Sequence, residues 1–289
     1  MNRYHSQRGA IPRWLGPAAG LLALTGCATN PYTERSQLLL VPESEEMQLG
    51  AQAYEQVLHS PKVKISHDPR EVEPVKRVAA RIIEAAKNSK YAERARQFEW
   101  EVTVIEDDKT MNAFALPGGK IAVYTGIFPV AKNEAGLAAI LGHEVTHALA
   151  RHGAERMSQG LLAQLGLEAA SIALGSGTNS AVGQATMAAL GLGMNVGVLL
   201  PFSRAHESEA DHIGLLLAAQ AGYDPVEAIH VWERMERLAK GQPPEFLSTH
   251  PGHGTRIKQL QEWMLEALSY YRPQLGMQVA DLPEISAGK

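Results

Sequence analysis

Hydrophobic residues recur at helical spacing over much of the chain. Apolar side chains follow one another at three- and four-residue steps from Glu45 to about Leu58, which predicts a helix. A second helix is expected from about Pro74 to Lys87, because proline fits a first helical turn. Three more helices are expected later in the chain, over about 203–221, 224–240 and 255–270.

The hydrophobic period changes to two in the middle of the chain. Apolar and polar residues alternate from Phe98 to Val104, which indicates a half-buried strand. Two further short strands, 112–116 and 120–125, flank a Pro117-Gly118-Gly119 turn and predict a hairpin. The expected fold is therefore α+β and mainly helical, with a small antiparallel sheet.

The next helix, capped by Asn133 and ended by Gly153, is apolar around its whole surface and contains a Gly-His-Glu-Val-Thr-His stretch. His143 and His147 stand one turn apart on the same face, where two imidazoles can hold one zinc ion. Glu144 would then lie beside the metal as a general base. The alternative is that both histidines are core residues with satisfied hydrogen bonds.

A catalytic zinc ion usually takes three protein ligands and keeps one position for water. A metzincin would place a histidine six residues after His147, but that position holds Gly153. A later helix offers Glu207 and Asp211 on one face. Glu207 can reach the metal, and Asp211 can accept the outer N–H of a liganding histidine. Asp211 could instead cap its helix or pair with Arg204 or Arg256.

The remaining polar residues near these motifs are expected at the surface or in ordinary packing. Glu209 lies off the Glu207 face and is expected to meet solvent. The histidines placed in this group are His152, His206, His212, His230 and His253.

The composition of the chain limits the partners and the metal ligands that can be expected. The 289 residues carry 27 Lys and Arg against 31 Asp and Glu, so the net charge of -4 gives no reason to expect a nucleic-acid partner. Hydrophobic residues make up 45% of the chain, enough for a substantial core. The single cysteine, Cys27, excludes an internal disulfide and a thiolate zinc cluster. Any metal must therefore be held by histidines and carboxylates.

The first 26 residues are typical of an export signal, with arginines before a short apolar run. The run ends in Leu24-Thr25-Gly26-Cys27, which resembles a bacterial lipobox. The alternative is an ordinary signal with a stray cysteine. A lipid on Cys27 would anchor the chain to a membrane surface. By resemblance to the sorting rule of Gram-negative lipoproteins, Ala28 favours the outer membrane, with the protein facing the periplasm.

These patterns predict four regions: a lipoprotein signal at 1–26, a tether at 27–44, a peptidase domain at 45–272 and a loose tail at 273–289. Residues 161–202, rich in Ala, Gly, Leu and Met, could enter a membrane or form small-residue helices near the site. Polar residues interrupt this stretch, which favours the second interpretation.

The combined motifs resemble the CAAX-prenyl-protease/HtpX type of gluzincin, metallopeptidase family forty-eight, over about residues 45–270. Besides the His143–His147 motif and Glu207-x-x-Ala-Asp211, the resemblance rests on Asn112-Ala113-Phe114-Ala115 with its Pro-Gly-Gly turn, and on Thr249-His250-Pro251 with Arg256-Ile257. The lipobox makes the chain most similar to LoiP- and BepA-like bacterial lipoprotein or periplasmic peptidases.

This resemblance implies a zinc-dependent metalloendopeptidase with one Zn²⁺ per chain. Its substrates would be unfolded or damaged envelope proteins, and a substrate would add as a strand along Asn112, Ala113, Phe114 and Ala115. His250 would lie near the zinc, as an oxyanion donor or as a fourth ligand, although it could also be a simple turn residue. The competing function is a zinc-stabilised chaperone or assembly factor with slow or vestigial proteolysis.

Overall fold

The computed structural model describes residues 26–173, 202–239, 245–250, 254–273 and 279–284. The longer helices are α2 (Glu43–Leu58), α3 (Pro69–Lys87), α6 (Glu134–Leu149), α7 (His152–Ala173), α9 (Arg204–Gln220), α10 (Val226–Ala239) and α12 (Arg256–Tyr270). The short helical pieces are α4 (Ala92–Gln97), η1 (Thr125–Ile127), α5 (Phe128–Ala131) and α11 (Glu245–Thr249). The strands are β1 (Cys27–Thr29), β2 (Ser36–Leu38), β3 (Glu101–Ile105), β4 (Ala113–Leu116) and β5 (Lys120–Tyr124). The mainly helical α+β prediction is confirmed.

Strands β3, β5 and β4 form one sheet in that order, with β4 at an edge. The predicted hairpin is present, because β4 and β5 pair antiparallel. Its turn needs φ values of 84° at Gly118 and 88° at Gly119, a region that glycine adopts without steric cost. Strand β3 joins β5 in parallel, so the sheet is mixed. Alternating residues predict a strand but not the direction of its neighbour, which explains this difference.

Helix α3 begins five residues earlier than its sequence pattern suggested. It starts at Pro69, and Pro74 lies inside it. Asp68 caps the helix by accepting a hydrogen bond of 2.9 Å from the backbone N–H of Arg70. Pro69 occupies the first helical position, where a missing N–H costs no helical hydrogen bond, whereas Pro74 removes one bond inside the helix.

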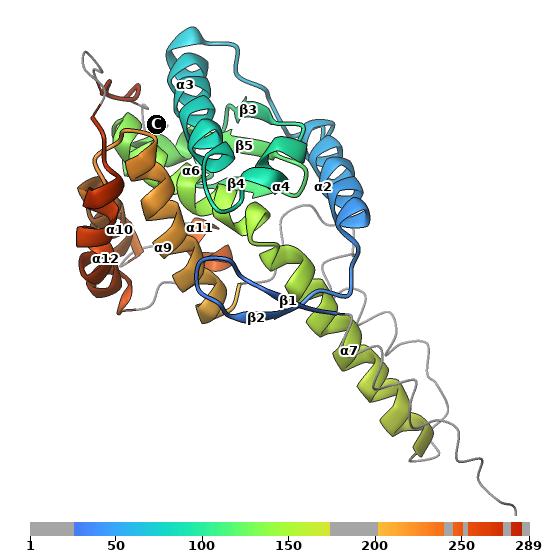
Figure 1. Cartoon of the computed structure of the whole chain (residues 1–289). Coiled ribbons are helices and arrows are strands. Elements are labelled where there is room, and N and C mark those ends of the chain that lie inside the picture. The colour runs from blue at the N-terminus through green and yellow to red at the C-terminus, as the bar shows by residue number, and fades with distance from the viewer. Residues whose placement is uncertain (1–25, 174–201, 240–244, 251–253, 274–278, 285–289) are drawn as a thin grey trace, which may run out of the picture.

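Helix α6, which carries the His143–His147 motif, runs through the centre of the molecule. Figure 1 shows the sheet and α3 on one side of α6, and α9, α10 and α12 on the other. Nearly every residue of α6 is buried, in agreement with its apolar sequence. Asn133 caps its start, as predicted, by accepting a hydrogen bond of 2.9 Å from Gly136 N–H.

Two glycines bring α6 and α9 into backbone contact. A Cβ atom on Gly142 would lie 2.5 Å from the carbonyl oxygen of Gly214, and one on Gly214 would lie 2.6 Å from the backbone nitrogen of His143. Both distances are shorter than real Cβ contacts allow. The absence of side chains here therefore sets the distance between the motif helix and the helix that carries Glu207.

A sharp break separates α6 from α7. Helix α6 ends at Leu149, and Arg151 adopts a φ of 59° before α7 starts at His152. A buried ion pair stabilises this left-handed residue, since Arg151 Nε donates to Glu46 Oε2 at 2.6 Å. Gly153, the terminator expected from the sequence, lies inside α7 instead. Beyond the break, α7 projects from the body of the molecule (Figure 1).

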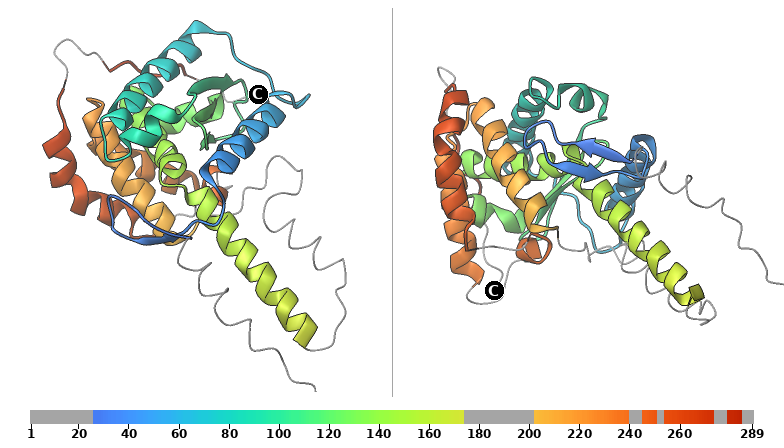
Figure 2. Two further views of the ribbon diagram at one scale, coloured as in Figure 1. Left: turned by 45° about the vertical axis from the view of Figure 1, so that its right-hand side comes forward. Right: turned by 60° about the horizontal axis from the view of Figure 1, so that its bottom comes forward.

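Residues 27–44 contain more structure than the tether expected from the sequence. Strands β1 and β2 form an antiparallel hairpin, and α2 begins at Glu43. Figure 2 shows this hairpin close to the start of α7 and to the N-terminal part of α9. Arg35 fixes it there by ion pairs of 2.7 Å to Glu155 on α7 and 2.8 Å to Glu209 on α9.

Part of the expected loose tail is also packed. The Glu134 N–H donates to the Ala280 carbonyl at 3.0 Å, and the Leu282 N–H donates to the Lys132 carbonyl at 3.0 Å. The side chain of Leu282 is buried. Residues 280–282 thus cover the start of the motif helix.

The stretch at 161–202 lies largely outside the described residues, since the description stops at 173 and resumes at 202. Within the described ranges, no helix has the length and the apolar content needed to cross a membrane. The described part of α7 exposes Leu161, Leu162 and Leu165 to solvent.

Candidate metal and catalytic site

Four side chains from three segments converge at the contact between α6 and α9. His143 and His147 come from α6, Glu207 from α9, and His250 from the residue after α11. All four are buried, and their potential ligand atoms lie within 4.8 Å of one another. The sequence prediction of His143, His147 and Glu207 as neighbours, with His250 close by, agrees with this arrangement.

The potential ligand atoms of these four side chains lie at similar distances from one another. His143 Nε2 lies 3.1 Å from His147 Nε2 and 3.2 Å from His250 Nδ1. The Glu207 carboxylate lies 3.0 Å from His250 Nδ1, 3.5 Å from His147 Nε2 and 3.6 Å from His143 Nε2. Two ligands of a tetrahedral zinc ion with bonds of about 2 Å would be about 3.3 Å apart. The site therefore has the dimensions of a zinc coordination sphere.

The chemistry of the four groups also suits zinc. Imidazole nitrogens and carboxylate oxygens are common zinc ligands, and here three of the first and one of the second lie close together. Such a convergence of electron-rich atoms is repulsive unless a cation or protons lie between them. Burial would raise the pKa of Glu207, but hydrogen bonds with His147 and His250 hold it well below its usual value. Glu207 is thus held as an anion.

On one side of the site, His143 contacts a carboxylate. His143 Nδ1 lies 2.9 Å from Asp211 Oδ1, as the sequence predicted for an outer partner. Arg256 holds Asp211 by an Nε–Oδ2 contact of 2.6 Å, and it also reaches Glu207 Oε2 at 2.9 Å. Burial would raise the pKa of Asp211, but Arg256 and His143 keep it below its usual value. An ionised Asp211 can only accept, so His143 donates from Nδ1 and presents a lone pair on Nε2.

On the other side, His147 contacts a second histidine. His147 Nδ1 lies 2.9 Å from His152 Nδ1, and His152 Nε2 lies 3.1 Å from Glu209 Oε2. His152 is fully buried, so of the two positions expected for it, surface or packing, the structure shows packing. Glu209 is only 5% exposed, so the prediction that it meets solvent is wrong. Burial lowers the pKa of His152 to about 4, against the opposing hydrogen bond with Glu209. His152 is therefore neutral at neutral pH.

His206, which was expected at the surface or in ordinary packing, is buried beside His152. Its ring stacks on His152 with centroids 4.5 Å apart, and its Nε2 lies 3.1 Å from Glu155 Oε2. His212 and His230 are partly exposed and pair with Glu266 and Glu227, as expected for surface residues. His253 lies outside the described residues.

Glu144 lies beside the four converging atoms without joining them. Its Oε1 atom lies 3.4 Å from His250 Nε2 and has no hydrogen-bond partner among the described residues. Burial raises the pKa of its carboxyl above the usual value, although His250 and His143 oppose that shift. A buried carboxyl with an unused oxygen and a raised pKa is suited to accept a proton.

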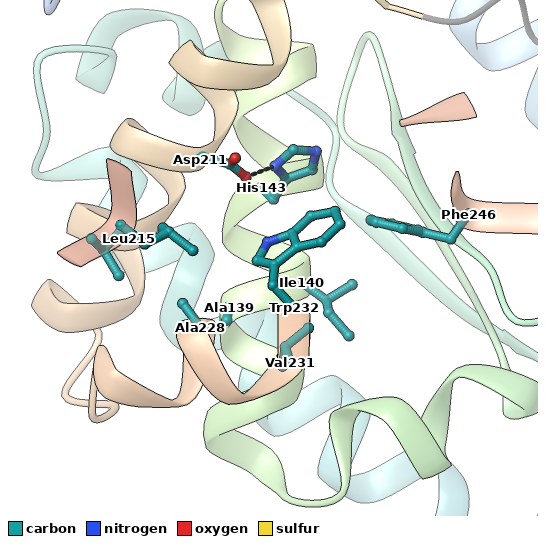
Figure 3. A pocket seen from close by; sticks show the side chains of 10 residues that line it. Ala139, Ile140, His143, Asp211, Leu215, Ala228, Val231, Trp232 and Phe246 are labelled. Carbon is teal, nitrogen blue, oxygen red and sulfur yellow. Dashed lines mark hydrogen bonds and ion pairs between the residues drawn. The ribbon is translucent and has the colours of Figure 1, made fainter. Parts of the chain in front are cut away.

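Aromatic and aliphatic side chains enclose the site. Phe202 stacks on His147 with centroids 4.0 Å apart, and Phe246 stacks on His250 at 4.5 Å. Behind His143 lies an apolar cavity of about 20 Å³, room for about one water molecule. Figure 3 shows Trp232 and Ile140 beside His143 and its bond to Asp211. This apolar surrounding strengthens the electrostatic interactions within the site.

The expected substrate strand and lipidation site lie in different places. Asn112, Ala113, Phe114 and Ala115 precede or form β4, the edge strand that packs on α6. Asn112 Oδ1 accepts the backbone N–H of Ala113 at 2.9 Å. Cys27 begins β1 and is exposed. It is not part of the metal-ligating group found among the described residues.

Comparisons with known proteins identify the chain's relatives. The model of Peptidase family M48 matches residues 70–264. Mitochondrial metalloendopeptidase OMA1 of Schizosaccharomyces pombe is 39% identical over 255 residues, which cover 86% of this chain and 69% of the relative. Metalloendopeptidase OMA1 of Homo sapiens is 33% identical over 84% of this chain and 47% of the relative.

The expected closeness to LoiP- and BepA-like peptidases is supported only in part. Beta-barrel assembly-enhancing protease of Yersinia pestis is 29% identical, over 51% of this chain and 31% of the relative. This match covers a smaller share of both chains than the matches to the OMA1 proteins do.

The same comparisons contradict the expected location. Residues 1–26 and Cys27 suggested an outer-membrane lipoprotein facing the periplasm, but the relatives that share more than two thirds of their length with this chain are mitochondrial. The outer-membrane prediction is therefore wrong. An arginine-containing segment without acidic residues is compatible with more than one compartment, since export signals and mitochondrial transit peptides share this charge pattern.

Proposed function

The chain belongs to peptidase family M48, and on that premise we propose that His143, His147 and Glu207 are its zinc ligands and Glu144 its general base. Peptidases of this family depend on zinc, and this chain is a metalloendopeptidase. The observation that carries the assignment is the convergence of buried ligand atoms at separations of 3.0–3.6 Å.

Bound zinc would polarise the carbonyl of the scissile peptide bond and lower the pKa of a water molecule. The chain's own residues supply the rest. Glu144, buried and with a raised pKa, takes the proton from the attacking water and passes it to the leaving amine. Asp211 accepts the Nδ1 proton of His143 and so leaves the Nε2 lone pair of that ring available to hold the metal.

The assignment of Glu144 is tested with Glu144→Gln, which keeps the shape of the side chain and removes its basicity. We expect cleavage of a chemically unfolded protein to fall by at least about a hundredfold, while one zinc per chain is retained. The measurements are product formation on a gel and metal content by atomic absorption. Equal cleavage by both proteins would exclude Glu144 as the base. Absence of cleavage in both would favour the chaperone or assembly-factor function.

We also propose that His250 is a fourth ligand in a closed form of the site. Its Nδ1 atom lies within 3.2 Å of both His143 Nε2 and the Glu207 carboxylate. A ligand at this position occupies the place that catalysis requires for water. Burial disfavours the charged ring of His250, but Glu144 and Glu207 raise its pKa above the usual value. Protonation would therefore compete with metal binding by His250.

His250→Ala is the test of this closed form. Opening the fourth position is expected to weaken zinc binding and to raise the rate of cleavage of an unfolded protein. Chelator competition and initial-rate assays measure the two effects. If neither zinc affinity nor cleavage changes, His250 does not contact the metal.

For the substrate, we propose an extended segment of a misfolded or misassembled protein. Strand β4 supports this choice, because an edge strand beside the motif helix can pair with any extended backbone and needs little side-chain recognition. The test compares cleavage of one protein in its native and its reduced, unfolded form. Faster cleavage of the native form would contradict the proposal.

We further propose that Cys27 carries a lipid. The exposed position of Cys27 at the start of β1 supports this proposal. Labelling with a fatty-acid analogue in cells should modify the native chain and not a Cys27→Ser variant. Equal labelling of both would place the lipid elsewhere.

A further inference from the structure

The hydrogen bonds beyond His147 form a continuous chain that the proposed mechanism leaves unused. It runs from His147 Nδ1 to His152 Nδ1 over 2.9 Å, and from His152 Nε2 to Glu209 Oε2 over 3.1 Å. Thr33 donates to Glu209 Oε1, and Arg35 Nη2 reaches Glu209 Oε2 at 2.8 Å. Both hairpin residues thus bind the carboxylate at the far end.

The donor and the acceptor in each of these hydrogen bonds follow from the residues at the two ends of the series, His147 and Glu209. A His147 ring that binds a metal through Nε2 must carry its proton on Nδ1. His152 Nδ1 must then accept, which leaves the proton of a neutral His152 on Nε2. Glu209, held by Arg35 and Thr33, is an acceptor for that proton. A single arrangement of protons therefore gives each hydrogen bond from His147 to Glu209 one donor and one acceptor.

The break between α6 and α7 brings His147 and His152 into contact. Residues five apart in a continuous helix point to different faces, so His147 and His152 could not meet without the turn at Arg151. The hairpin supports this turn as well as the carboxylate. Gln37 Nε2 donates to the Ala150 carbonyl at 2.8 Å, next to the left-handed residue.

We propose that His152 is a positioning residue that fixes the proton and the ring orientation of His147, and that the β1–β2 hairpin completes it by holding Glu209. This inference rests on the proposed role of His147 as a zinc ligand. Asp211 fixes the proton and the ring orientation of His143 by direct contact. His147 instead contacts the imidazole of His152, which lies between it and the carboxylate of Glu209. The hairpin therefore belongs to the metal site.

Two substitutions of His152 separate its two contacts. Asparagine places a polar atom where Nδ1 faces His147 and loses the contact with Glu209. Glutamine reaches the position of Nε2 near Glu209 and loses the contact with His147. We expect His152→Gln to weaken zinc binding by about 10- to 100-fold and His152→Asn to weaken it by less than about fivefold.

The readouts are zinc affinity by chelator competition and the visible spectrum of the cobalt-substituted protein, with thermal unfolding of the metal-free form as the check on folding. His206→Asn is the matched control, because His206 is buried in the same corner and does not contact His147. We expect it to leave zinc affinity within about threefold of the wild type and the cobalt spectrum unchanged.

The outcomes distinguish this inference from the proposed function. Failure of the wild-type protein to bind zinc would refute the proposed function itself. Normal binding by the wild type with equal affinities in His152→Asn and His152→Gln would overturn the role of His152. An equal loss in His206→Asn would reduce the effect to general packing. For the hairpin, Arg35→Gln should weaken zinc binding by about 2- to 5-fold, no more than His152→Asn, because it acts on His147 only through Glu209. An unchanged affinity would remove the hairpin from the proposal.

Discussion

The two histidines of the motif helix have different surroundings. His143 donates directly to a carboxylate, Asp211, which a single arginine holds from the neighbouring helix α12. His147 reaches its carboxylate, Glu209, only through His152, and the residues that hold Glu209 come from the N-terminal hairpin. The first side is short and is built from helices α6, α9 and α12. The second is longer and depends on a segment far away in the sequence.

The two sides of the proposed metal site therefore differ in rigidity: the side of His143 is rigid, and the side of His147 is more easily disturbed. Asp211 and Arg256 are both almost fully buried. Arg35 retains about a quarter of its side-chain exposure and lies in a two-stranded hairpin. Small hairpins have little stability of their own, so events at the surface can reach His147 more readily than His143.

The largest loss of stability and zinc affinity is expected from Asp211→Asn, which changes the rigid side of the site. The substitution removes the anion that pairs with Arg256 and leaves His143 only a neutral amide oxygen, which is a weaker acceptor than a carboxylate. Removing one partner of a buried ion pair costs about 3–5 kcal/mol, and the residual pair with Glu207 places this variant at the lower end. Zinc affinity should fall by about 10- to 100-fold. Urea unfolding of the metal-free protein and chelator competition measure the two effects.

Glu209→Gln is the matched change on the other side. It should reduce zinc affinity by less than Asp211→Asn does, because His152 still separates residue 209 from His147. A larger loss in Glu209→Gln would reverse the assignment of the rigid and the more easily disturbed side.

An intermediate effect is expected from Gly214→Ala, which acts on both sides together. The added Cβ atom would meet the backbone nitrogen of His143 at 2.6 Å, so α6 and α9 must separate. Overpacking of this kind costs about 1–3 kcal/mol. Thermal unfolding should detect the loss, and the cobalt spectrum should change because Glu207 moves away from the histidines. Gly254→Ala is the control, since a Cβ atom there meets nothing within 4 Å.

The smallest effect concerns pH and the hairpin. Burial opposes ionisation of Glu155, but hydrogen bonds with His206 and Arg35 lower its pKa below the usual value near 4.5. A carboxyl with a lowered pKa in the folded state stabilises the fold above its unfolded pKa, and this contribution is lost as the pH falls. Unfolding free energy should therefore decrease below about pH 4.5, and less steeply in Glu155→Gln. Identical pH profiles for the two proteins would exclude this contribution.

The sequence predicted the part of the site that follows helical periodicity. His143, Glu144 and His147 share one helix, and Glu207 with Asp211 shares another, so a spacing of four residues was enough to place each pair. Neither spacing nor composition could place His152 and Glu209. Their contact depends on a helix break at a non-glycine residue, Arg151, which local patterns do not indicate.

The fold shows the same division. The hairpin of β4 and β5 was predicted from its glycine turn and alternation, both of which are local. The parallel partner β3 and the docking of Arg35 on Glu209 involve residues far apart in sequence. A strand pattern near Cys27 was too short, at three residues for each strand, to be distinguished from an extended tether.

The packing of Ala280 and Leu282 against the start of α6 has a consequence for synthesis. A chain emerging from the ribosome contains His143 and His147 long before residues 280–282, which supply backbone partners to Glu134 and Lys132. The start of the motif helix therefore gains these backbone partners only after all four side chains of the proposed metal site, His250 included, have been synthesised. Docking of the start of α6 thus depends on a segment that follows the whole metal site in the sequence.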